Sequence, residues 1–379
     1  MAENIKPLTS LRGIAALMIL FHHALVFLTQ NLGDSVAAYT HFFKNGYLWV
    51  DFFSILSGFI LTHVYATIFV NDINSFSYRS FLFSRFARLY PLHLFILLLF
   101  MSIELLKLII PDDHPFIGNK SLVGLISNVL LLQATDLTTP PLFGEMTYWN
   151  EPAWSISAEW LIYLLFPFLI VLLHRRKSTY NLALYLVAWS FLLIVVELTW
   201  GSLDFLGLPS LARCGLECIV GILTYNVYQK NILRHHMNIN SLLFASMGWI
   251  ILVMHHDWHD LLIIPAFCLL FLTAAIKNES NDSFMLVALN SRLMIYVGTI
   301  SYSIYMVHWF IQESIWRIWK IIFKTDYGFG GNLNAYQSVF LMIGYTLTVL
   351  VVASLAYRLI EEPMRVFLKN STLAKKHLY

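Results

Sequence analysis

The chain has 379 residues, of which 58% are hydrophobic and only 12% charged, and its mean hydropathy is +0.68. A soluble domain carries about twice that charged fraction, so the composition excludes an ordinary soluble protein and indicates a polytopic membrane protein. The formal net charge of +2 gives no indication of a nucleic-acid partner. The cysteines, Cys214, Cys218 and Cys268, all lie in apolar runs, which suits packing better than a disulfide or a metal site.

Apolar runs follow one another along the sequence and predict an all-α polytopic membrane protein with about ten transmembrane helices. The runs cover 11–29, 47–69, 89–110, 153–173, 180–200, 211–228, 242–254, 261–276, 294–323 and 338–359. A further run at 122–133 is too short to span and is expected to be interfacial or re-entrant. The segment before the first run is too short for a cleaved signal peptide, so that run is expected to remain as a span.

The charges between the runs predict which side each loop faces. With a cytoplasmic N-terminus, one set of loops contains Arg79, Arg85, Arg88, Arg175, Arg176, Lys177, Lys230, Arg234, Lys277 and Arg292, followed by a tail with Arg365, Lys369, Lys375 and Lys376. The opposite loops contain Lys44, Lys120 and Lys324 with Asp112, Asp113, Asp136, Glu145 and Glu151. This asymmetry follows the positive-inside rule and predicts two cytoplasmic termini. We expect one integral-membrane domain over 1–379, with no appended soluble domain.

The first span carries ionisable residues at positions that lipid disfavours. Arg12 lies at its start, and His22 and His23 lie two-thirds of the way across. At about 100° per residue, Arg12 and His23 share one helical face, whereas His22 points off that face. An ionisable residue inside a span normally faces the bundle interior or a wet cavity. The alternative is a pair of histidines hydrogen-bonded between helices for packing only.

Helical rise predicts that three ionisable residues lie at a similar depth. A rise of about 1.5 Å per residue places His23 roughly 18 Å, and Glu159 and His308 roughly 21 Å, from the cytoplasmic boundary. Ser57 comes close to the midplane. A carboxylate in hydrocarbon needs donors or a cationic partner, so we expect a histidine beside Glu159, oriented as a general base. A purely structural Glu–His pair is the alternative.

Further polar side chains accompany these three residues along the same spans. Trp154, Ser155 and Ser157 precede Glu159, and Ser301 and Tyr305 share a helical stripe with His308, with Tyr302 beside them. Hydroxyl groups on such a stripe often only join helices, so site lining and packing both remain open.

Near the predicted cytoplasmic side, Arg85 and Arg88 form an R-x-x-R segment. If this turn is helical, both guanidiniums share one face and suit a phosphate-rich ligand, because each can bind bidentately. Topology signalling or contact with lipid headgroups would explain the same residues. Arg12, Arg358 and Glu361 are expected at this level too.

The segment 255–260, HHDWHD, has the residue types of a metal site. It lies in a short outer loop, where polar residues are expected in any case. We therefore predict no metal there or elsewhere.

Taken together, these segments resemble acyltransferase family three, integral-membrane acyl-CoA-dependent acyltransferases found widely in bacteria. The matching elements are the Arg-x10-His motif at Arg12 and His23, FF-x-x-SGF at 52–59, R-x-x-R at Arg85 and Arg88, WSISAE at 154–159, SYSIYMVH at 301–308 and YRLIEEP at 357–363. Each is weak alone, but their order over nearly the whole chain makes them strong together.

The resemblance implies that cytoplasmic acyl-CoA, usually acetyl-CoA, gives its acyl group to a hydroxyl on the other side, mostly on a surface glycan. No bound cofactor is implied, and acyl-CoA is a co-substrate. His23 would be the central catalytic group, with Glu159 or His308 positioning it or balancing its charge. The CoA phosphates would be held by Arg12, Arg85, Arg88 and Arg358. Ser57, Trp154, Ser155, Ser157, Ser301, Tyr302, Tyr305 and Glu361 would line the site.

The expected location is the bacterial cytoplasmic (inner) membrane. Many relatives carry an appended extracytoplasmic hydrolase-like domain, which we do not expect in this chain, so a separate extracytoplasmic partner protein is one expectation. The rival class is a multi-span transporter or flippase whose histidines and Glu159 form a proton relay, although no inverted repeat supports it.

Overall fold

The structure, a computed structural model, describes residues 4–70, 73–109, 114–135, 148–174, 178–199, 201–204, 206–230, 238–278, 283–323 and 333–370. Every regular element in these ranges is helical, which confirms the predicted all-α class. Several charges used to predict the orientation lie outside the described residues, namely Asp112, Asp113, Asp136, Glu145, Arg175, Arg176, Lys177, Arg234, Lys324, Lys375 and Lys376.

Six of the described helices are long and apolar enough to cross a membrane. They are α1 (Lys6–His23) with η1 (Ala24–Leu28), α3 (Trp49–Phe69) after η2 (Lys44–Leu48), α4 (Ser75–Lys107), α6 (Trp154–His174) after η5 (Glu151–Ala153), α8 (Leu208–Gln229), and α14 (Ala335–Ala356) with η8 (Tyr357–Glu361) and α15 (Glu362–Asn370). The remaining predicted runs correspond to α7 (Ser178–Thr199), α9 (Ile239–His255), α10 (Ile263–Ile276) and the pair α12 (Arg292–Thr299) and α13 (Ser301–Phe323). A multi-span protein is therefore supported, but the count of ten is not, because α9 and α10 are shorter than a span and the side chains of α7 are described only in part.

The predicted continuous span at 294–323 is wrong, because α12 and α13 meet at an angle of 61°. The two helices pass the span test only as a broken pair, which brings the number of candidate spans to at most seven among the described residues. The break lies at Ile300, directly before the Ser301–His308 segment.

Helix α4 begins well before the predicted start of its span. Asn74 caps it by accepting a hydrogen bond from the backbone N–H of Ser77 at 2.8 Å, and the Ser77 hydroxyl contacts the backbone N–H of Asn74 in return. The cap extends the helix through Arg85 and Arg88, so both arginines lie on a helix as the R-x-x-R spacing requires.

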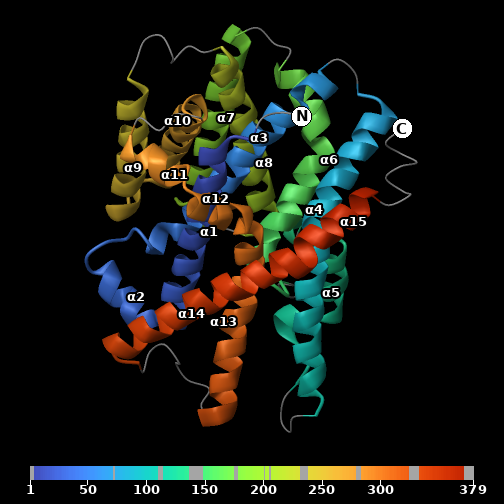
Figure 1. Cartoon of the computed structure of the whole chain (residues 1–379), viewed down its shortest axis with the longest axis vertical. Helices are drawn as coiled ribbons and strands as arrows, with labels where there is room; N and C mark the ends of the chain where they lie inside the picture. The colour runs from blue at the N-terminus through green and yellow to red at the C-terminus, as the bar shows by residue number, and fades with distance from the viewer. Residues whose placement is uncertain are drawn as a thin grey trace.

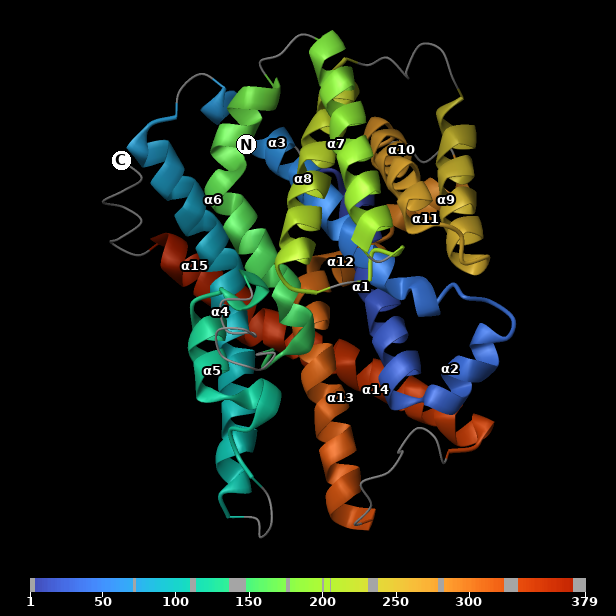
Figure 2. The same cartoon turned by 180° about the vertical axis from the view of Figure 1, so that it is seen from behind.

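The helices surround a central group in which α1, α3, α6, α8 and α13 lie next to one another (Figures 1 and 2). Helices α9 and α10 pack together on one flank, and α14 with α15 runs obliquely across the face shown in Figure 1. Short helices complete the described part, including α2 (Gln30–Ala37), α5 (Leu122–Val129) and α11 (Phe284–Leu289). The run predicted at 122–133 is thus a short helix followed by a turn, as expected for a segment that does not span.

The first span is held against α12 by backbone contact. A Cβ added to Gly298 would lie 1.9 Å from the carbonyl oxygen of Thr9, and one added to Gly13 would lie 2.6 Å from the nitrogen of Gly298. Such distances leave no room for a methyl group unless one helix moves. Close approach through small residues is how membrane helices pack without a hydrophobic driving force between them.

We expect Gly298→Ala to destabilise the protein by about 1–3 kcal/mol or more, because overpacking here displaces backbone. The measurement is the temperature at which the detergent-solubilised protein loses its monodisperse elution peak. Gly344→Ala on α14 is the matched control, since its added Cβ has nothing within 4 Å. Equal stability of the two variants would contradict the close packing of α1 and α12.

Candidate active site

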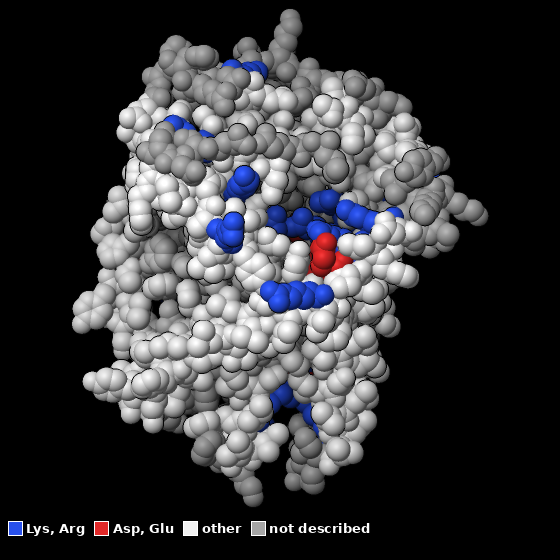
Figure 3. Space-filling model, in the orientation of Figure 1, with Lys and Arg blue, Asp and Glu red and all other residues white. Residues whose placement is uncertain are grey.

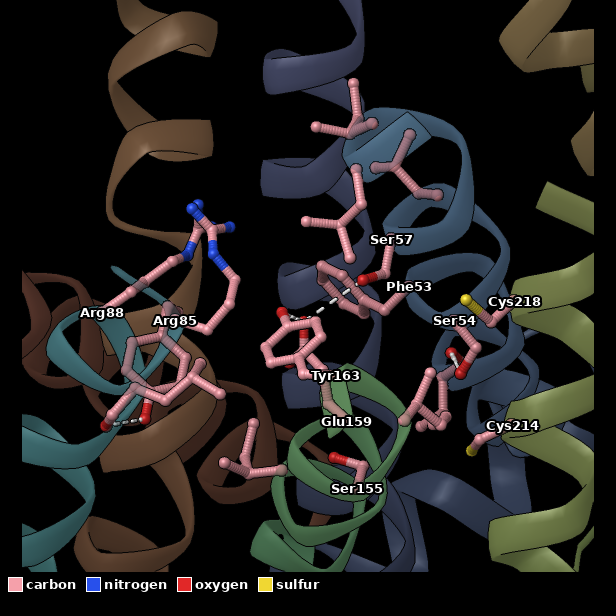
Figure 4. A pocket seen from close by; sticks show the side chains of 18 of the residues that line it. Phe53, Ser54, Ser57, Arg85, Arg88, Ser155, Glu159, Tyr163, Cys214 and Cys218 are labelled. Atoms are coloured by element: carbon pink, nitrogen blue, oxygen red, sulfur yellow. Dashed lines mark hydrogen bonds between the residues drawn. The ribbon is translucent and has the colours of Figure 1, made fainter. Parts of the chain in front are cut away.

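A pocket lies where α1, α3, α4, α6, α8 and α13 meet, and it is partly open to solvent (Figure 4). Nine residues singled out from the sequence line it: Arg12, Ser57, Arg85, Arg88, Ser155, Glu159, Ser301, Tyr302 and Tyr305. Motifs from five separate segments of the chain therefore converge on one cavity.

One end of the pocket is strongly basic. Arg85 donates to the Tyr65 hydroxyl at 3.1 Å, and Arg12 contacts the Ser301 hydroxyl at 3.4 Å. Among the described residues, none of Arg12, Arg85 and Arg88 lies within ion-pair distance of a carboxylate, although Glu361 is close enough to Arg12 and Arg88 to interact with them electrostatically. Figure 3 shows a hollow in the surface with Lys and Arg side chains gathered around it.

Helix α15 adds a cation that the sequence reasoning counted only as a tail charge. Lys369 lies close enough to Arg85 and Arg88 to interact with both electrostatically. Lys369 reaches this end because α15 packs against α4, and no sequence motif indicates that contact.

Glu159 occupies the middle of the pocket, between the arginines and the cysteines in Figure 4. Its carboxylate accepts hydrogen bonds from Tyr163 and, at 3.4 Å, from Ser57. The predicted pairing of Glu159 with a histidine is therefore wrong. Depth along a helix fixes how far a side chain lies from the boundary but not its direction around the helix, and Glu159 faces the arginine side.

The two histidines predicted at one depth do meet. Nδ1 of His23 and Nε2 of His308 are 2.9 Å apart, and the ring planes differ by 14°. His308 is completely buried, whereas His23 keeps some exposure. The pair joins the end of α1 to α13.

The hydrogen bonds of the pair determine where its protons lie. Nδ1 of His308 is 2.7 Å from the carbonyl oxygen of Tyr305, and a carbonyl can only accept, so this nitrogen carries hydrogen. In the neutral ring Nε2 of His308 is then an acceptor and Nδ1 of His23 is its donor. The lone pair of neutral His23 consequently lies on Nε2, which has no hydrogen-bond partner among the described residues.

The histidine pair is not part of the pocket lining, but His308 lies next to Tyr305, which is. The Tyr305 hydroxyl is 2.7 Å from both the Ser155 hydroxyl and the Pro152 carbonyl oxygen. Its ring lies 6.2 Å from that of Phe53 and 5.8 Å from that of His308. Tyr305 thus lines the pocket and also lies next to His308.

Two π-helical segments adjoin the site, and helical periodicity did not predict them. Helix α1 becomes π-helical directly after His23, and α14 does so from Tyr357, so that Arg358 and Glu361 lie in the second segment. A π-turn shifts the face on which the following side chains lie, and such turns occur frequently at functional sites.

The other predicted site residues lie outside the pocket lining. Ser157 donates to the carbonyl oxygen of Leu131 at 2.7 Å, and buried Trp154 stacks on the guanidinium of Arg213 at 5.5 Å. Glu361 accepts a hydrogen bond from Ser303 at 2.6 Å. Arg358 is exposed and its guanidinium lies 5.9 Å from the Tyr296 ring. In these positions they join elements that surround the pocket.

Side chains of the 255–260 segment form hydrogen bonds with residues between positions 40 and 47. His255 contacts the Thr40 hydroxyl at 2.8 Å, and Asp257 accepts from Asn45 at 2.8 Å. Asp260 accepts from the Tyr47 hydroxyl at 3.0 Å. Within the described ranges, no group of three His, Cys, Asp or Glu side chains is placed to hold a metal.

The profile of an acyltransferase domain matches residues 6–358, nearly the whole chain. The chain belongs to acyltransferase family three. It is similar to protein 2 in the picA locus of Rhizobium radiobacter, with 34% identity over 167 residues, which cover 42% of this chain and 79% of that protein. It is also similar to the acyltransferase MdmB of Streptomyces mycarofaciens, with 30% identity over 167 residues, or 43% of this chain and 38% of MdmB. No solved structure matches the chain.

Family membership makes this chain a multi-pass membrane acyltransferase. The match covers every residue of the pocket lining and both histidines, but it ends at Arg358, before Glu361 and α15. The basic contribution of Lys369 is thus outside the shared domain.

Proposed function

We propose that this acyltransferase moves an acyl group, acetyl in the simplest case, from cytoplasmic acyl-CoA to a hydroxyl on the opposite side of a bacterial inner membrane. The proposed acceptor class is a surface glycan. One observation carries the proposal: a single pocket runs from three arginines, none of which forms an ion pair with a described carboxylate, to Tyr305, one helical turn from the His23–His308 pair.

Acyl-CoA, the proposed donor, fits the basic end of the pocket. CoA carries a 3′-phosphate and a pyrophosphate, and a guanidinium can hold a phosphate by two parallel hydrogen bonds. Arg12, Arg85 and Arg88 come from two helices and face one cavity, so they can hold phosphates that are separated along the nucleotide. The thioester would then extend along the pocket past Glu159, towards Tyr305.

The chemistry uses the free lone pair of His23. Nε2 takes the proton of the acceptor hydroxyl as its oxygen attacks the thioester carbonyl, the C–S bond breaks, and the proton passes to the thiolate. The products are the acyl ester and CoA, with no net change in protons. His308 stabilises the transient imidazolium, because Nδ1–H of His23 continues to donate to it. In a two-step version the same Nε2 attacks the thioester and carries the acyl group itself.

The test is turnover by the purified protein in lipid nanodiscs supplied with labelled acetyl-CoA and glycan acceptors. Release of CoA together with a labelled ester supports the proposal. Label that remains on the protein after the acceptor is omitted, and that is lost in His23→Ala, identifies the two-step version. Solute uptake by proteoliposomes without CoA release would favour the transporter class.

Glu159→Gln is expected to lower kcat by about tenfold or more while KM for acetyl-CoA falls or stays level. Ser57 and Tyr163 both donate to Oε1 of Glu159, and the neutral amide oxygen of glutamine accepts these hydrogen bonds less strongly than a carboxylate oxygen does. Removing a negative charge beside the arginines also strengthens the binding of an anion, so product CoA leaves more slowly.

Steady-state kinetics at two ionic strengths measure this change, since salt weakens the electrostatic part. Glu159→Asp, which keeps the charge, is the comparison variant. A raised KM with unchanged kcat in Glu159→Gln would show that Glu159 only helps to hold the donor.

A further inference from the structure

The pocket has two ends of different chemistry. Figure 4 shows Arg85 and Arg88 on one side of Glu159, and Cys214, Cys218 and Ser54 on the other. The second end is formed by α3 and α8, and its side chains are small or apolar. Cysteine behaves as a small hydrophobic side chain, so this end suits a short apolar group and not a charged one.

The walls of this second end cannot separate easily. A Cβ added to Gly58 would lie 2.1 Å from the carbonyl oxygen of Cys218, and one added to Gly221 would lie 2.0 Å from that of Ile55. The backbones of α3 and α8 are therefore in direct contact beside the pocket. With the backbones fixed, the side chains at positions 214 and 218 determine how much space remains.

A buried charge cluster behind the same end holds the two helices together. Arg213 on α8 lies 3.4 Å from Asp51 on α3 and 3.8 Å from Glu217, and all three side chains are at most 3% exposed. Separating the helices would leave these charges buried without partners, which is strongly unfavourable. The cluster thus makes the second end rigid as well as narrow.

We propose that this α3/α8 end of the pocket binds the acyl group of the donor, and that Cys214 and Cys218 restrict that group to short chains. The proposal rests on the proposed function, because it needs an acyl-CoA whose phosphates occupy the arginine end. It assigns a role to side chains that composition alone suggests are only packing.

The test compares acetyl-, propionyl- and butyryl-CoA as donors for the wild type, Cys214→Ala and Cys218→Ala. One methylene in an apolar pocket changes selectivity by about 10- to 200-fold, so the alanine variants should raise the propionyl-to-acetyl ratio of kcat/KM by about tenfold. Cys268→Ala on α10, buried and away from the pocket, is the matched control and should keep the wild-type ratio.

A larger side chain at position 218 should reduce the space for the acyl group. Cys218→Leu should lose transfer from acetyl-CoA while binding free CoA, which has no acyl group, with wild-type affinity. If Cys218→Leu fails to fold, donor selectivity in the two alanine variants alone tests the proposed acyl site. Unchanged donor selectivity in both alanine variants, or a changed KM for the acceptor only, would overturn the acyl site. Absence of transfer from any acyl-CoA in the wild type would instead overturn the proposed function.

Discussion

His23→Ala is expected to lower acyl transfer by at least about 10²–10⁴-fold, the typical contribution of a positioned general base, and to abolish it if His23 carries the acyl group. The variant removes the only nitrogen of the His23–His308 pair with a free lone pair. Transfer of labelled acetyl groups measures the loss. Added imidazole should restore part of the rate, because the alanine leaves space beside His308.

His22→Ala is the matched control on the adjacent residue. Nδ1 of His22 bonds the carbonyl oxygen of Phe43 at 2.9 Å, and its ring packs against Tyr47. These contacts join α1 to η2 and do not involve His308, so the variant should lose activity only mildly. Equal loss in the two variants, both correctly inserted, would count against His23 as the reacting group.

The common depth of His23 and His308 could be predicted from the rise per residue, and the Arg12 spacing gave the face of α1 on which His23 lies. Their contact could not be predicted, because the direction of His308 depends on how α13 packs against α1. The 61° break between α12 and α13 precedes Ser301, so the Ser301–His308 segment is helical, as the shared stripe of Ser301, Tyr305 and His308 requires.

The partner of Glu159 could not be predicted, since rotation of α6 about its axis depends on packing against α3 and α8. The place of the cysteines in the pocket wall was missed for a related reason. Cys214 and Cys218 were expected to pack within an apolar run, but they border a cavity, and local sequence does not distinguish a packed interface from a cavity wall. Likewise, the arginine spacing in α4 was informative, whereas Lys369 reaches the same end through the packing of α15.

Arg85→Lys and Arg88→Lys are each expected to raise KM for acetyl-CoA by about ten- to a hundredfold, with normal membrane topology. A charge-assisted hydrogen bond contributes about 1.5–3 kcal/mol, and lysine keeps the positive charge but loses the planar pair of donors. In Arg85→Lys the contact with Tyr65 is also weakened, so this guanidinium is oriented less well. KM for the acceptor should barely change, because the proposed acceptor would reach the histidines from the opposite side.

Arg79→Lys is the matched control, because Arg79 is exposed on the same helix and does not line the pocket. If Arg85 and Arg88 act only through the positive-inside rule, all three lysine variants will behave as wild type and only alanine variants will insert wrongly. If they hold CoA phosphates, Arg79→Lys alone will keep the wild-type KM. The two explanations therefore differ in the lysine variants, where the charge is constant and only the geometry of the donors changes.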